Sequence, residues 1–540
     1  MSGKKSIRAS FLMVSATFLK FGIPVQICLK VQGVLEGMVE LSAKLIGVPV
    51  GRRMILLHQD DARRSGIRSY DRVKVSYKKE TIIAIADATI SHLKPGELGI
   101  FGEVEDKLGI KDGGSVSVTL ARTPESVEYI RRKMKGRSYS KDAIQAIIRD
   151  VVDHSLGELE IAAFLMAEEF YGLSMDEIQY LVEAMVNTGT VIDFDRPCYD
   201  KHSIGGVPGN KVSLLVVPIV AAAGLLIPKT SSRAITSPSG TADTMEVLAN
   251  VEFDASELKE LALKVGGAIV WGGKLGIAPA DDLLIRVEYP LSIDPRGQML
   301  ASIIAKKLAV GVDGVVVDIP VGQCAKVETV EEARRLAQSF VDLGDRFNMR
   351  VQCGMTYGGQ PVGHTVGPAL EAREALLALN GEGPASLIEK STSLAGMILE
   401  MGGVASKDRG KDLAKEILSS GKALEKMREI IEAQGGNSKI KPEEISVGQY
   451  SIEIIAPCDG FVTNVDNAAV TAIARAAGAP VEKGAGIALR LKRGYKVEKN
   501  DVLFEIFAER QSKLDEAHNV ALKTRPITIE GMLIQTFPEY

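Results

Sequence analysis

Short apolar runs separated by turn residues fill residues 38–121. Runs of this length, bounded by glycine and proline, are typical of β-strands. We therefore expect a small β-rich N-terminal domain at 38–121. The runs that predict its strands are KLIGVPV (44–50), RMILLH (53–58), DRVKVSY (71–77), ETIIAIAD (80–87) and GSVSVTLA (114–121).

The period of the apolar positions becomes helical near residue 140. Ile144, Ile147, Ile148 and Val151 recur at a spacing that places their side chains on one face of an α-helix. The segment SMDE (174–177) has the Ser and Glu spacing of a capping box, which marks a further helix start. A helical layer is thus expected to follow the β-rich domain.

From residue 199 to about 435, apolar runs alternate with amphipathic segments. The runs DGVVVDIP (313–320) and MRVQCGMT (349–356) flank the helical pattern EEARRLAQSFVDLGDRF (331–347). Strand and helix patterns that alternate in this way predict a mainly parallel sheet with helices on its faces. Ligands of such sheets bind in the loops beyond the carboxyl ends of the strands.

After a polar linker around 434–447 the chain becomes β-rich again. Its runs are YSIEIIAPCDGFVTNVD (450–466), GIALRLKRGYKV (486–497) and VLFEIFAE (502–509). The whole pattern predicts a multidomain α/β fold. Its parts are the β-rich domain at 38–121, a catalytic region at 122–440 with a helical domain and an α/β domain, and a β-rich C-terminal α+β domain at 445–531.

Residues 1–37 fit none of these domains. Their basic start and the apolar stretch between Arg8 and Lys20 imitate a secretory signal, but that stretch is too short to span a membrane. We expect these residues to be an extension outside the fold, with Met38 as the true start of the protein.

Composition narrows the possible classes of partner. Hydrophobic residues make up 46% of the 540 residues and charged residues 25%, which is typical of a globular protein with a large core. The formal net charge is only -4, so no global charge favours nucleic acid or an anionic membrane as a partner. Sites for anions must therefore be local.

The cysteines and histidines are scattered. The five cysteines lie far apart, which favours a reducing cytoplasm over a disulfide framework or a thiolate zinc site. The six histidines form no helical metal-binding pair. We expect a cytoplasmic protein without a bound metal.

The first loop with candidate chemistry is KHSIGGVPGNK (201–211). It precedes a helix expected to begin near Val212, so its glycines can direct backbone N–H groups towards one point at a helix N-terminus. That geometry favours an anion, most often phosphate, and Lys201 and Ser203 would add a charge and a hydroxyl donor. The spacing matches neither a Walker loop nor a dinucleotide fingerprint, so a plain tight turn stays an alternative, as does a packing role for His202.

A second loop, TSSRAITSPSGTAD (230–243), gathers hydroxyl side chains around Arg233 directly after an apolar run. Hydroxyls and an arginine are good donors to phosphate or ribose oxygens. The alternative is a solvated turn in which Thr241 caps the next helix. Two donor-rich loops in one α/β unit favour a binding site.

A third region supplies carboxylates and lysines. Asp294 precedes a helix that contains Ser302, Lys306 and Lys307, and Lys326 follows a predicted strand. Asp294 could be only the cap of that helix, and the two adjacent lysines could be only a solvated helix face.

Six segments together resemble the thymidine phosphorylase family in order and spacing, across about residues 120–510. They are MVNTGTVIDF (185–194), KHSIGGVPGNK (201–211), SSRAITSPSGTADTME (231–246), GIAPADD (276–282), ASIIAKKLA (301–309) and QPVGHTVGPALEAREAL (360–376). Thymidine phosphorylases carry a Gly-rich, His-containing loop where this chain has SRAITSPSGTAD, and they lack the domain at 38–121. Both departures resemble the archaeal branch of the family, the nucleoside monophosphate phosphorylases that act on AMP.

The resemblance implies that AMP and inorganic phosphate react to give adenine and ribose 1,5-bisphosphate, with no cofactor other than phosphate as co-substrate. It also implies a homo-oligomer. Carried over residue by residue, the family's proton donor falls on Asp294. Its nucleotide and phosphate contacts fall on Gly206, Ser232, Arg233, Ala234, Ile235, Thr236, Ser237, Thr241, Ser302 and Lys326.

These residue types suit that chemistry. Cleavage of the bond between base and ribose builds positive charge on the sugar and negative charge on the base, so the base needs a proton and the sugar a nearby anion. An ordinary Asp has a pKa of about 3.9, so Asp294 can donate near neutrality only if burial raises that value. The 5′-phosphate of the substrate requires a second anion site beside that for inorganic phosphate, and the two donor-rich loops offer two.

Two other functions stay open at this point. One is phosphorolysis of a pyrimidine nucleoside, such as thymidine or uridine, on the same fold. The other is a nucleotide-binding regulator without turnover. The sequence does not fix which base is preferred among AMP, CMP and UMP.

Overall fold

The structure is a computed structural model that describes residues 38–234, 237–323 and 325–532. It divides into two units, one that ends at Ala167 and one that begins at Glu168. The expected extension at 1–37 lies outside the described residues.

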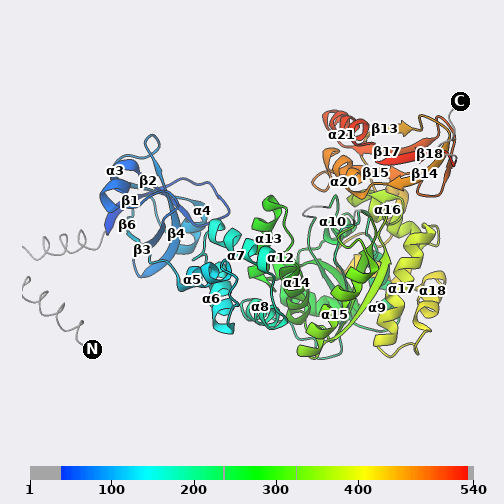
Figure 1. Ribbon diagram of the computed structural model, residues 1–540, viewed down its shortest axis with the longest axis horizontal. Helices are drawn as coiled ribbons and strands as arrows, with labels where there is room; N and C mark the ends of the chain where they lie inside the picture. The colour runs from blue at the N-terminus through cyan, green and yellow to red at the C-terminus, as the bar shows by residue number, and fades with distance from the viewer. Residues whose placement is uncertain (1–37, 235–236, 324, 533–540) are drawn as a thin grey trace, which may run out of the picture. The chain divides into compact units, whose positions relative to one another are not determined.

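A closed six-stranded barrel opens the first unit (Figure 1). Inward-facing residues such as Val73, Val75, Val116 and Val118 are fully buried and alternate with more exposed neighbours. The strand order around the barrel is β1-β5-β2-β4-β3-β6, and two short helices, α3 (Gln59–Ser65) and α4 (Gly102–Leu108), adjoin it. The strands are β1 (Val39–Leu45), β2 (Met54–His58), β3 (Arg72–Tyr77), β4 (Glu80–Thr89), β5 (Glu97–Ile100) and β6 (Ser115–Leu120).

Two details of the barrel differ from the sequence prediction. The expected strand at 44–50 lies mostly in a loop, because Gly47 has a φ of +67° and Pro49 follows. The strand β5 was not predicted at all. It contains Gly99, where a Cβ would lie 2.8 Å from the Ile46 side chain, so this residue is selected for close packing and not for strand propensity.

Helices follow the barrel. They are α5 (Glu125–Lys133), α6 (Lys141–Val152) and α7 (Glu158–Tyr171), which runs across the division between the units. The apolar face predicted for α6 is confirmed, since Ile144, Ile147, Ile148 and Val151 are all buried. In the second unit, α8 (Met175–Asn187) begins with the predicted capping box of Ser174 and Glu177.

A parallel sheet forms the centre of the second unit, as expected. Its strands are β7 (Tyr199–Ser203), β8 (Ile227–Ser231), β9 (Gly267–Trp271), β10 (Gly314–Val321) and β11 (Arg350–Tyr357). They form a three-stranded sheet, β11-β10-β7, and a pair, β8-β9, in which every pairing is parallel. Among the described residues, β7 and β8 are joined by one parallel bridge, between Cys198 and Leu226 at their amino ends.

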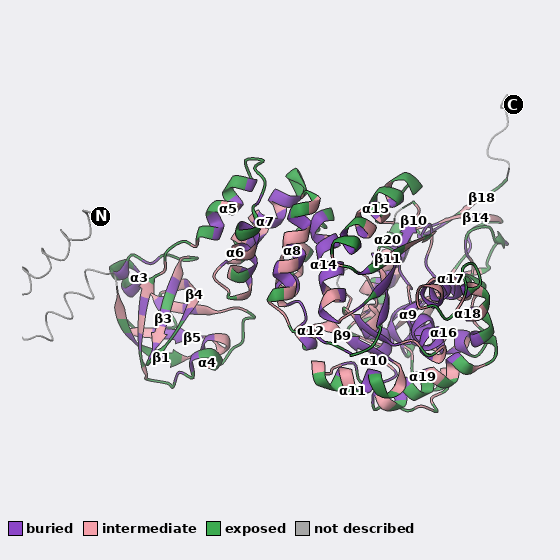
Figure 2. Cartoon of the chain, turned by 90° about the horizontal axis from the view of Figure 1, so that it is seen from below, coloured by how far each residue is buried: buried purple, intermediate pink, exposed green. Residues whose placement is uncertain are grey.

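Helices cover this sheet (Figure 1). The strand β10 is buried along almost its whole length, as is α9 (Ser213–Ala222), which packs on β8 and β9 (Figure 2). That burial is typical of a parallel strand with both faces covered. The other helices are α10 (Thr241–Glu246), α11 (Ala255–Val265), α12 (Gly272–Leu275), α13 (Pro279–Leu291), α14 (Arg296–Ala309), α15 (Val330–Arg346), α16 (Pro368–Leu379), α17 (Ala385–Met401), α18 (Gly410–Ser419) and α19 (Lys422–Ala433).

The C-terminal part is mixed α and β, as predicted, and is built into the rest of its unit. Its strand β15 (Gly486–Leu489) pairs with β12 (Thr365–Val366) of the preceding region, and Lys492 Nζ donates to the carbonyls of Pro361 (2.7 Å) and Gly363 (2.8 Å). The remaining elements are β13 (Tyr450–Ile455), β14 (Gly460–Val465), α20 (Asn467–Ala476), β16 (Lys496–Val497), β17 (Val502–Ala508), α21 (Gln511–Thr524) and β18 (Ile527–Glu530). The predicted fold class is thereby confirmed.

Candidate active site

The carboxyl ends of β7 and β8 open into a small cavity of about 140 Å³. Ser203 ends β7 and Ser231 ends β8, so the two loops predicted to bind anions meet here. Three of the lining residues are lysines, against one aspartate. The lining consists of His202, Ser203, Lys229, Thr230, Ser231, Ser232, Trp271, Gly272, Gly273, Ile277, Ala278, Asp282, Lys306 and Lys307.

Buried lysines form the floor of this cavity and its surroundings. Lys307 contacts the carboxylate of Asp200, and Lys229 Nζ lies 3.8 Å from the other oxygen of that carboxylate. Lys201 Nζ lies 3.8 Å from Asp318 Oδ2. Burial lowers the pKa of Lys229 to about 7 and that of Lys201 to about 8, since the charged form is poorly solvated. Lys229 and Lys307 share the Asp200 carboxylate, so an anion that enters the cavity would give these two ammonium groups a second partner.

Lys306 extends the cluster towards α13. Its Nζ lies 2.5 Å from Asp281 Oδ2 and donates to Ser302 Oγ over 3.2 Å. The alternative that Lys306 and Lys307 form a solvated face is wrong, because Lys307 is fully buried and Lys306 is engaged with a buried carboxylate. Ser302 thus stands beside the cavity through its contact with Lys306.

His202 is buried beside the lysines, and its Nδ1 has no hydrogen-bond partner among the described residues. Burial, and then the charges of Lys307 and Lys229, hold the pKa of His202 well below its usual value. The imidazole is therefore neutral at physiological pH, so it is suited to accept or share a hydrogen bond and not to act as a cation.

Asp294 and Lys326 form a contact ion pair at a second cavity, of about 290 Å³. Gly206 lies directly against Lys326, because a Cβ at Gly206 would come within 2.8 Å of the Lys326 backbone nitrogen. Ile204, one residue past Ser203, lines the second cavity, so the two cavities flank the end of β7. Three of the residues predicted for the site therefore meet here.

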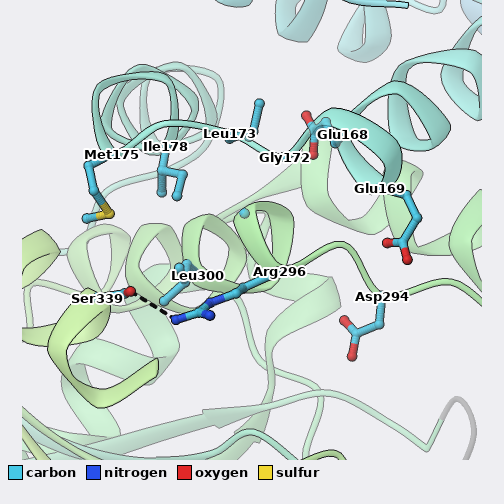
Figure 3. Close-up of a pocket in the computed structure, with 11 residues that line it drawn as sticks. Glu168, Glu169, Gly172, Leu173, Met175, Ile178, Asp294, Arg296, Leu300 and Ser339 are labelled. Atoms are coloured by element: carbon cyan, nitrogen blue, oxygen red, sulfur yellow. Dashed lines mark hydrogen bonds between the residues drawn. The ribbon is translucent and has the colours of Figure 1, made fainter. Parts of the chain in front are cut away.

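The side chain of Asp294 is 44% exposed and does not cap the next helix. The N-cap of α14 is Pro295, and no side chain caps that helix, so the alternative role for Asp294 as a helix cap is wrong. Asp294 also lines a third cavity, of about 490 Å³, together with Glu168 and Glu169 (Figure 3). At the other end of that cavity, Arg296 donates to Ser339 Oγ over 3.2 Å (Figure 3).

The segment 232–240, which we call the hydroxyl loop, connects β8 to α10. Ser232 lines the first cavity, and the Ser237 hydroxyl donates to the Ser239 carbonyl over 3.1 Å. Thr241 is the first residue of α10, whose N-cap is Gly240, so Thr241 is not the cap that was considered. Ile235 and Thr236 lie outside the described residues.

Arg233 does not point its guanidinium into open space. It donates to both oxygens of Glu246 (2.6 and 2.7 Å) and to Glu252 (3.0 Å), and it stacks 4.9 Å from the ring centre of Trp271. The hydrogen bonds that Arg233 donates to Glu246, and then to Glu252, raise the pKa of Arg233 above its ordinary value. In this structure Arg233 braces the hydroxyl loop, while Ala234 N donates to the buried Asp243 over 2.6 Å.

Sequence reasoning missed Lys229, which lines the cavity, and Asp200 and Asp281, which pair with its lysines. It also missed Asp318, the partner of Lys201. A signal was present for Lys229, which stands in the apolar run LLIPKT with no adjacent acidic residue to offset it. A lysine in a strand that packs on both faces must find a partner, so its position alone indicated a buried ionic site.

No cluster of three or more His, Cys, Asp or Glu side chains suited to a metal ion occurs within 38–234, 237–323 and 325–532. Over the same ranges, each helix is too short or too polar to cross a bilayer.

Models of known protein domains match three parts of this chain. Residues 195–424 match the model of the "Glycosyl transferase family, a/b domain", and residues 127–189 match its "helical bundle domain". Residues 461–528 match the "Pyrimidine nucleoside phosphorylase C-terminal domain". The helical and α/β domains thus match a glycosyl transferase family, and the C-terminal part matches a domain named for pyrimidine nucleoside phosphorylases.

Relatives that align with most of the chain distinguish the thymidine phosphorylases from the branch that acts on AMP. The AMP phosphorylase of Thermococcus kodakarensis is 56% identical over 488 residues, which is 90% of this chain and 97% of that protein. Those of Methanosarcina barkeri and Pyrococcus furiosus are each 52% identical, over 92% and 91% of this chain and 99% and 98% of their own lengths. The chain belongs to the AMP phosphorylase family.

Membership of the AMP phosphorylase family makes this chain an enzyme of the glycosyltransferase class. It also confirms the resemblance drawn from the six sequence segments. Both cavities that flank β7 lie within the matched α/β domain.

Proposed function

We propose that the chain catalyses the phosphorolysis of AMP to adenine and ribose 1,5-bisphosphate. The observation that carries this proposal is the cavity at the ends of β7 and β8, where Lys229, Lys306 and Lys307 converge with hydroxyl side chains. Lys229 and Lys307 share the single carboxylate of Asp200, so each can also bind an anion, and hydroxyl donors match the oxygens of a phosphate or a ribose. The second cavity, with Lys326, gives room for the other phosphate group of the reaction.

In the proposed reaction an oxygen of inorganic phosphate attacks C1′ of the ribose. The bond from C1′ to the base nitrogen breaks, its electron pair stays on the base, and the Asp294 carboxyl gives a proton to a ring nitrogen of the base. The carbon–oxygen bond to phosphate forms as the base leaves. Asp294 ends the step as a carboxylate, which is the form that pairs with Lys326 in the structure.

Lys326 links phosphate binding to the proposed proton donor, because it forms a contact ion pair with Asp294. A phosphate that binds Lys326 would compete with Asp294 for this cation and free the Asp294 side chain to approach the leaving base. Closure around the substrate would then exclude water from the reaction.

The other proposed contacts follow from position. Gly206 leaves room for the Lys326 backbone, Ser302 accepts a hydrogen bond from Lys306, and Ser232 of the hydroxyl loop lines the first cavity. The proposed ligand residues are Gly206, Ser232, Arg233, Ala234, Ile235, Thr236, Ser237, Thr241, Ser302 and Lys326, with Asp294 as donor. We keep Lys201 and Ser203 as further candidates.

We propose that CMP and UMP are also substrates, that phosphate is the only co-substrate, and that the enzyme works as a cytoplasmic homo-oligomer. Nucleic acid and membranes are not expected partners. Apolar side chains exposed on the chain, such as Phe170 and Tyr171 in α7, are the kind of surface that a second copy would cover.

The deciding experiment is the release of free base from a panel of substrates with and without phosphate. We expect adenine from AMP only when phosphate is present, and little base from uridine or thymidine. Turnover of the nucleosides in preference to AMP would favour a pyrimidine nucleoside phosphorylase. Tight AMP binding without any release of base would favour a regulator.

A further inference from the structure

The hydroxyl loop is fastened at both ends to one buried carboxylate. Asp243, 2% exposed in the first turn of α10, accepts hydrogen bonds from Ala234 N (2.6 Å) and Gly240 N (3.0 Å) through the same oxygen. The positions of both ends of the loop therefore depend on the Asp243 side chain.

A buried carboxylate needs cations, and Asp243 has two nearby. Arg233 Nη1 lies 3.6 Å from Asp243 Oδ1, and the Lys483 ammonium lies 3.3 Å from the same oxygen. Lys483 stands between α20 and β15, in the C-terminal domain. One of the two charges that support the loop thus comes from the C-terminal domain.

Lys483 also supports Arg233 through a shared partner. Its ammonium lies 2.8 Å from Glu246 Oε2, the oxygen to which Arg233 donates. Hydrogen bonds from Arg233, and then from Lys483, hold the pKa of Glu246 at about 2, so this group stays ionised at any working pH. Arg233, Lys483, Asp243 and Glu246 form one connected set of charges.

A second contact from the C-terminal domain reaches the loop independently. Arg475 in α20 donates through Nη1 to the Ser237 carbonyl (3.4 Å) and through Nη2 to the Tyr289 hydroxyl (3.0 Å). Tyr289 lies in α13, the helix that carries Asp281 and Asp282 at the cavity. Arg475 therefore ties the far end of the hydroxyl loop to a helix of the site.

We infer that Lys483 and Arg475 are positioning residues for the nucleotide, so that the C-terminal domain completes the substrate site of its own chain. They act through the hydroxyl loop and touch no reacting atom. This inference rests on the proposed function in one respect, namely that the loop holds the nucleotide. It goes beyond that function by giving the terminal domain a part in substrate affinity.

Two readouts test the inference. The first is the KM for AMP beside kcat in Lys483→Met, Lys483→Arg and Arg475→Met. A loop that has lost one of its supports binds the ground state and the transition state less well alike, so we expect KM for AMP to rise about tenfold with kcat within about threefold. Lys483→Arg, which keeps the charge, should restore most of the affinity.

The matched control is Lys513→Met. Lys513 lies in the same domain, and its side chain is 32% exposed against 35% for Lys483. It pairs with Glu516 at 2.7 Å, a residue outside the hydroxyl loop. It should leave KM, kcat and amide exchange unchanged. If Lys513→Met raised KM as much as Lys483→Met, general loosening of the domain and not the loop contact would be responsible.

The second readout needs no activity and separates this inference from the proposed function. Amide hydrogen exchange of the peptide that spans 232–240 should be faster in Lys483→Met and in Arg475→Met than in the unmodified protein, and unchanged in Lys513→Met. Unchanged exchange in both folded variants overturns the inference, whether or not the protein turns over AMP. Faster exchange in a protein that releases no adenine would leave the loop support standing and refute the proposed function alone.

Discussion

At the scale of single residues, the site is governed by which charges are buried and which partner each of them has. The resemblance read from the sequence pointed to Asp294, Lys326 and Gly206, and the structure places Asp294 and Lys326 at one cavity with Gly206 against Lys326. The sequence could not show that the Arg233 guanidinium is paired with Glu246 and Glu252, because those contacts depend on how the loop folds back on α10. Nor could it show the burial of the lysines, since adjacent lysines in a helix are usually solvated.

Asp294→Asn should separate binding from turnover. Asparagine keeps the shape of the side chain but cannot give up a proton to the leaving base. We expect kcat on AMP to fall by about 10²-fold or more, with KM for AMP nearly unchanged. Initial rates of adenine release provide the measurement, with Asp345→Asn, at an exposed position of α15, as the control. Near-normal turnover in Asp294→Asn would exclude Asp294 as the donor.

Glu288 should make stability depend on pH. Burial, and then the charges of Asp281 and Asp294, raise its pKa to about 8 from an ordinary 4.5, so the folded protein keeps a proton that the unfolded chain has released. The stability that depends on this proton is full below pH 4.5 and is lost as pH rises to about 8.

The variant Glu288→Gln is neutral at every pH and should therefore lose less stability between pH 5 and pH 9 than the unmodified protein. We expect the difference in Tm between those two pH values to shrink by at least about 2 °C. Thermal unfolding followed by circular dichroism measures it. Glu260→Gln, exposed on α11, is the control and should change nothing.

At the scale of elements, apolar runs predicted the strands and helices that form the parallel sheet. The runs at 313–320 and 349–356 became β10 and β11, and the helix expected near Val212 became α9. The short elements were harder. The helices α20 and α21 in the C-terminal domain were not predicted individually, although Val470 and Ile473 of α20 are buried at a helical spacing.

The loop from β7 to α9 depends on glycine at position 206. Gly206 has a φ of +84°, and a Cβ there would lie 2.8 Å from the Lys326 backbone nitrogen. Gly206→Ala should displace Lys326 and reduce kcat/KM on AMP at least about tenfold, on the usual scale for a misplaced phosphate contact. Steady-state kinetics would show it.

Gly224→Ala is the matched control for that variant. Gly224 also has a positive φ, of +90°, but nothing lies within 4 Å of its missing Cβ. Both variants should lose about 1 kcal/mol of stability through backbone strain, whereas only Gly206→Ala should lose activity. Equal activity in the two variants would mean that the approach to Lys326 has no functional role.

At the scale of the whole molecule, the N-terminal barrel has its own core and closes on itself. A closed barrel has no free strand edge that a second copy could cover. An assembly role for this domain therefore has to rest on its outer faces. The C-terminal domain differs, because its sheet continues into β12 and its core includes Val366 from outside the domain.

Removal of the barrel is the cleaner of the two possible truncations. A chain that starts at Arg122 keeps both cavities and the C-terminal contacts, all of which lie in the second unit. We expect its kcat on AMP to stay within about threefold of the full chain, on the usual scale of changes remote from a site, while the number of subunits falls. Light scattering gives the mass beside initial rates at moderate temperature. An unchanged subunit count would refute the assembly role.

The single bridge between β7 and β8 has a thermodynamic consequence. Beyond Cys198 and Leu226 the described strands share no ladder hydrogen bond, and Asp200 of β7 spans the gap to Lys229 of β8. A phosphate bound there would be a second anion beside Lys229, in addition to Asp200. The co-substrate would then add a contact between β7 and β8 for as long as it is bound. The protein should accordingly melt at a higher temperature in phosphate than in chloride of equal ionic strength. The gain would be about 2.7 kcal/mol at a hundredfold excess over Kd, and the enzyme would be at its most heat-resistant when its own co-substrate is plentiful.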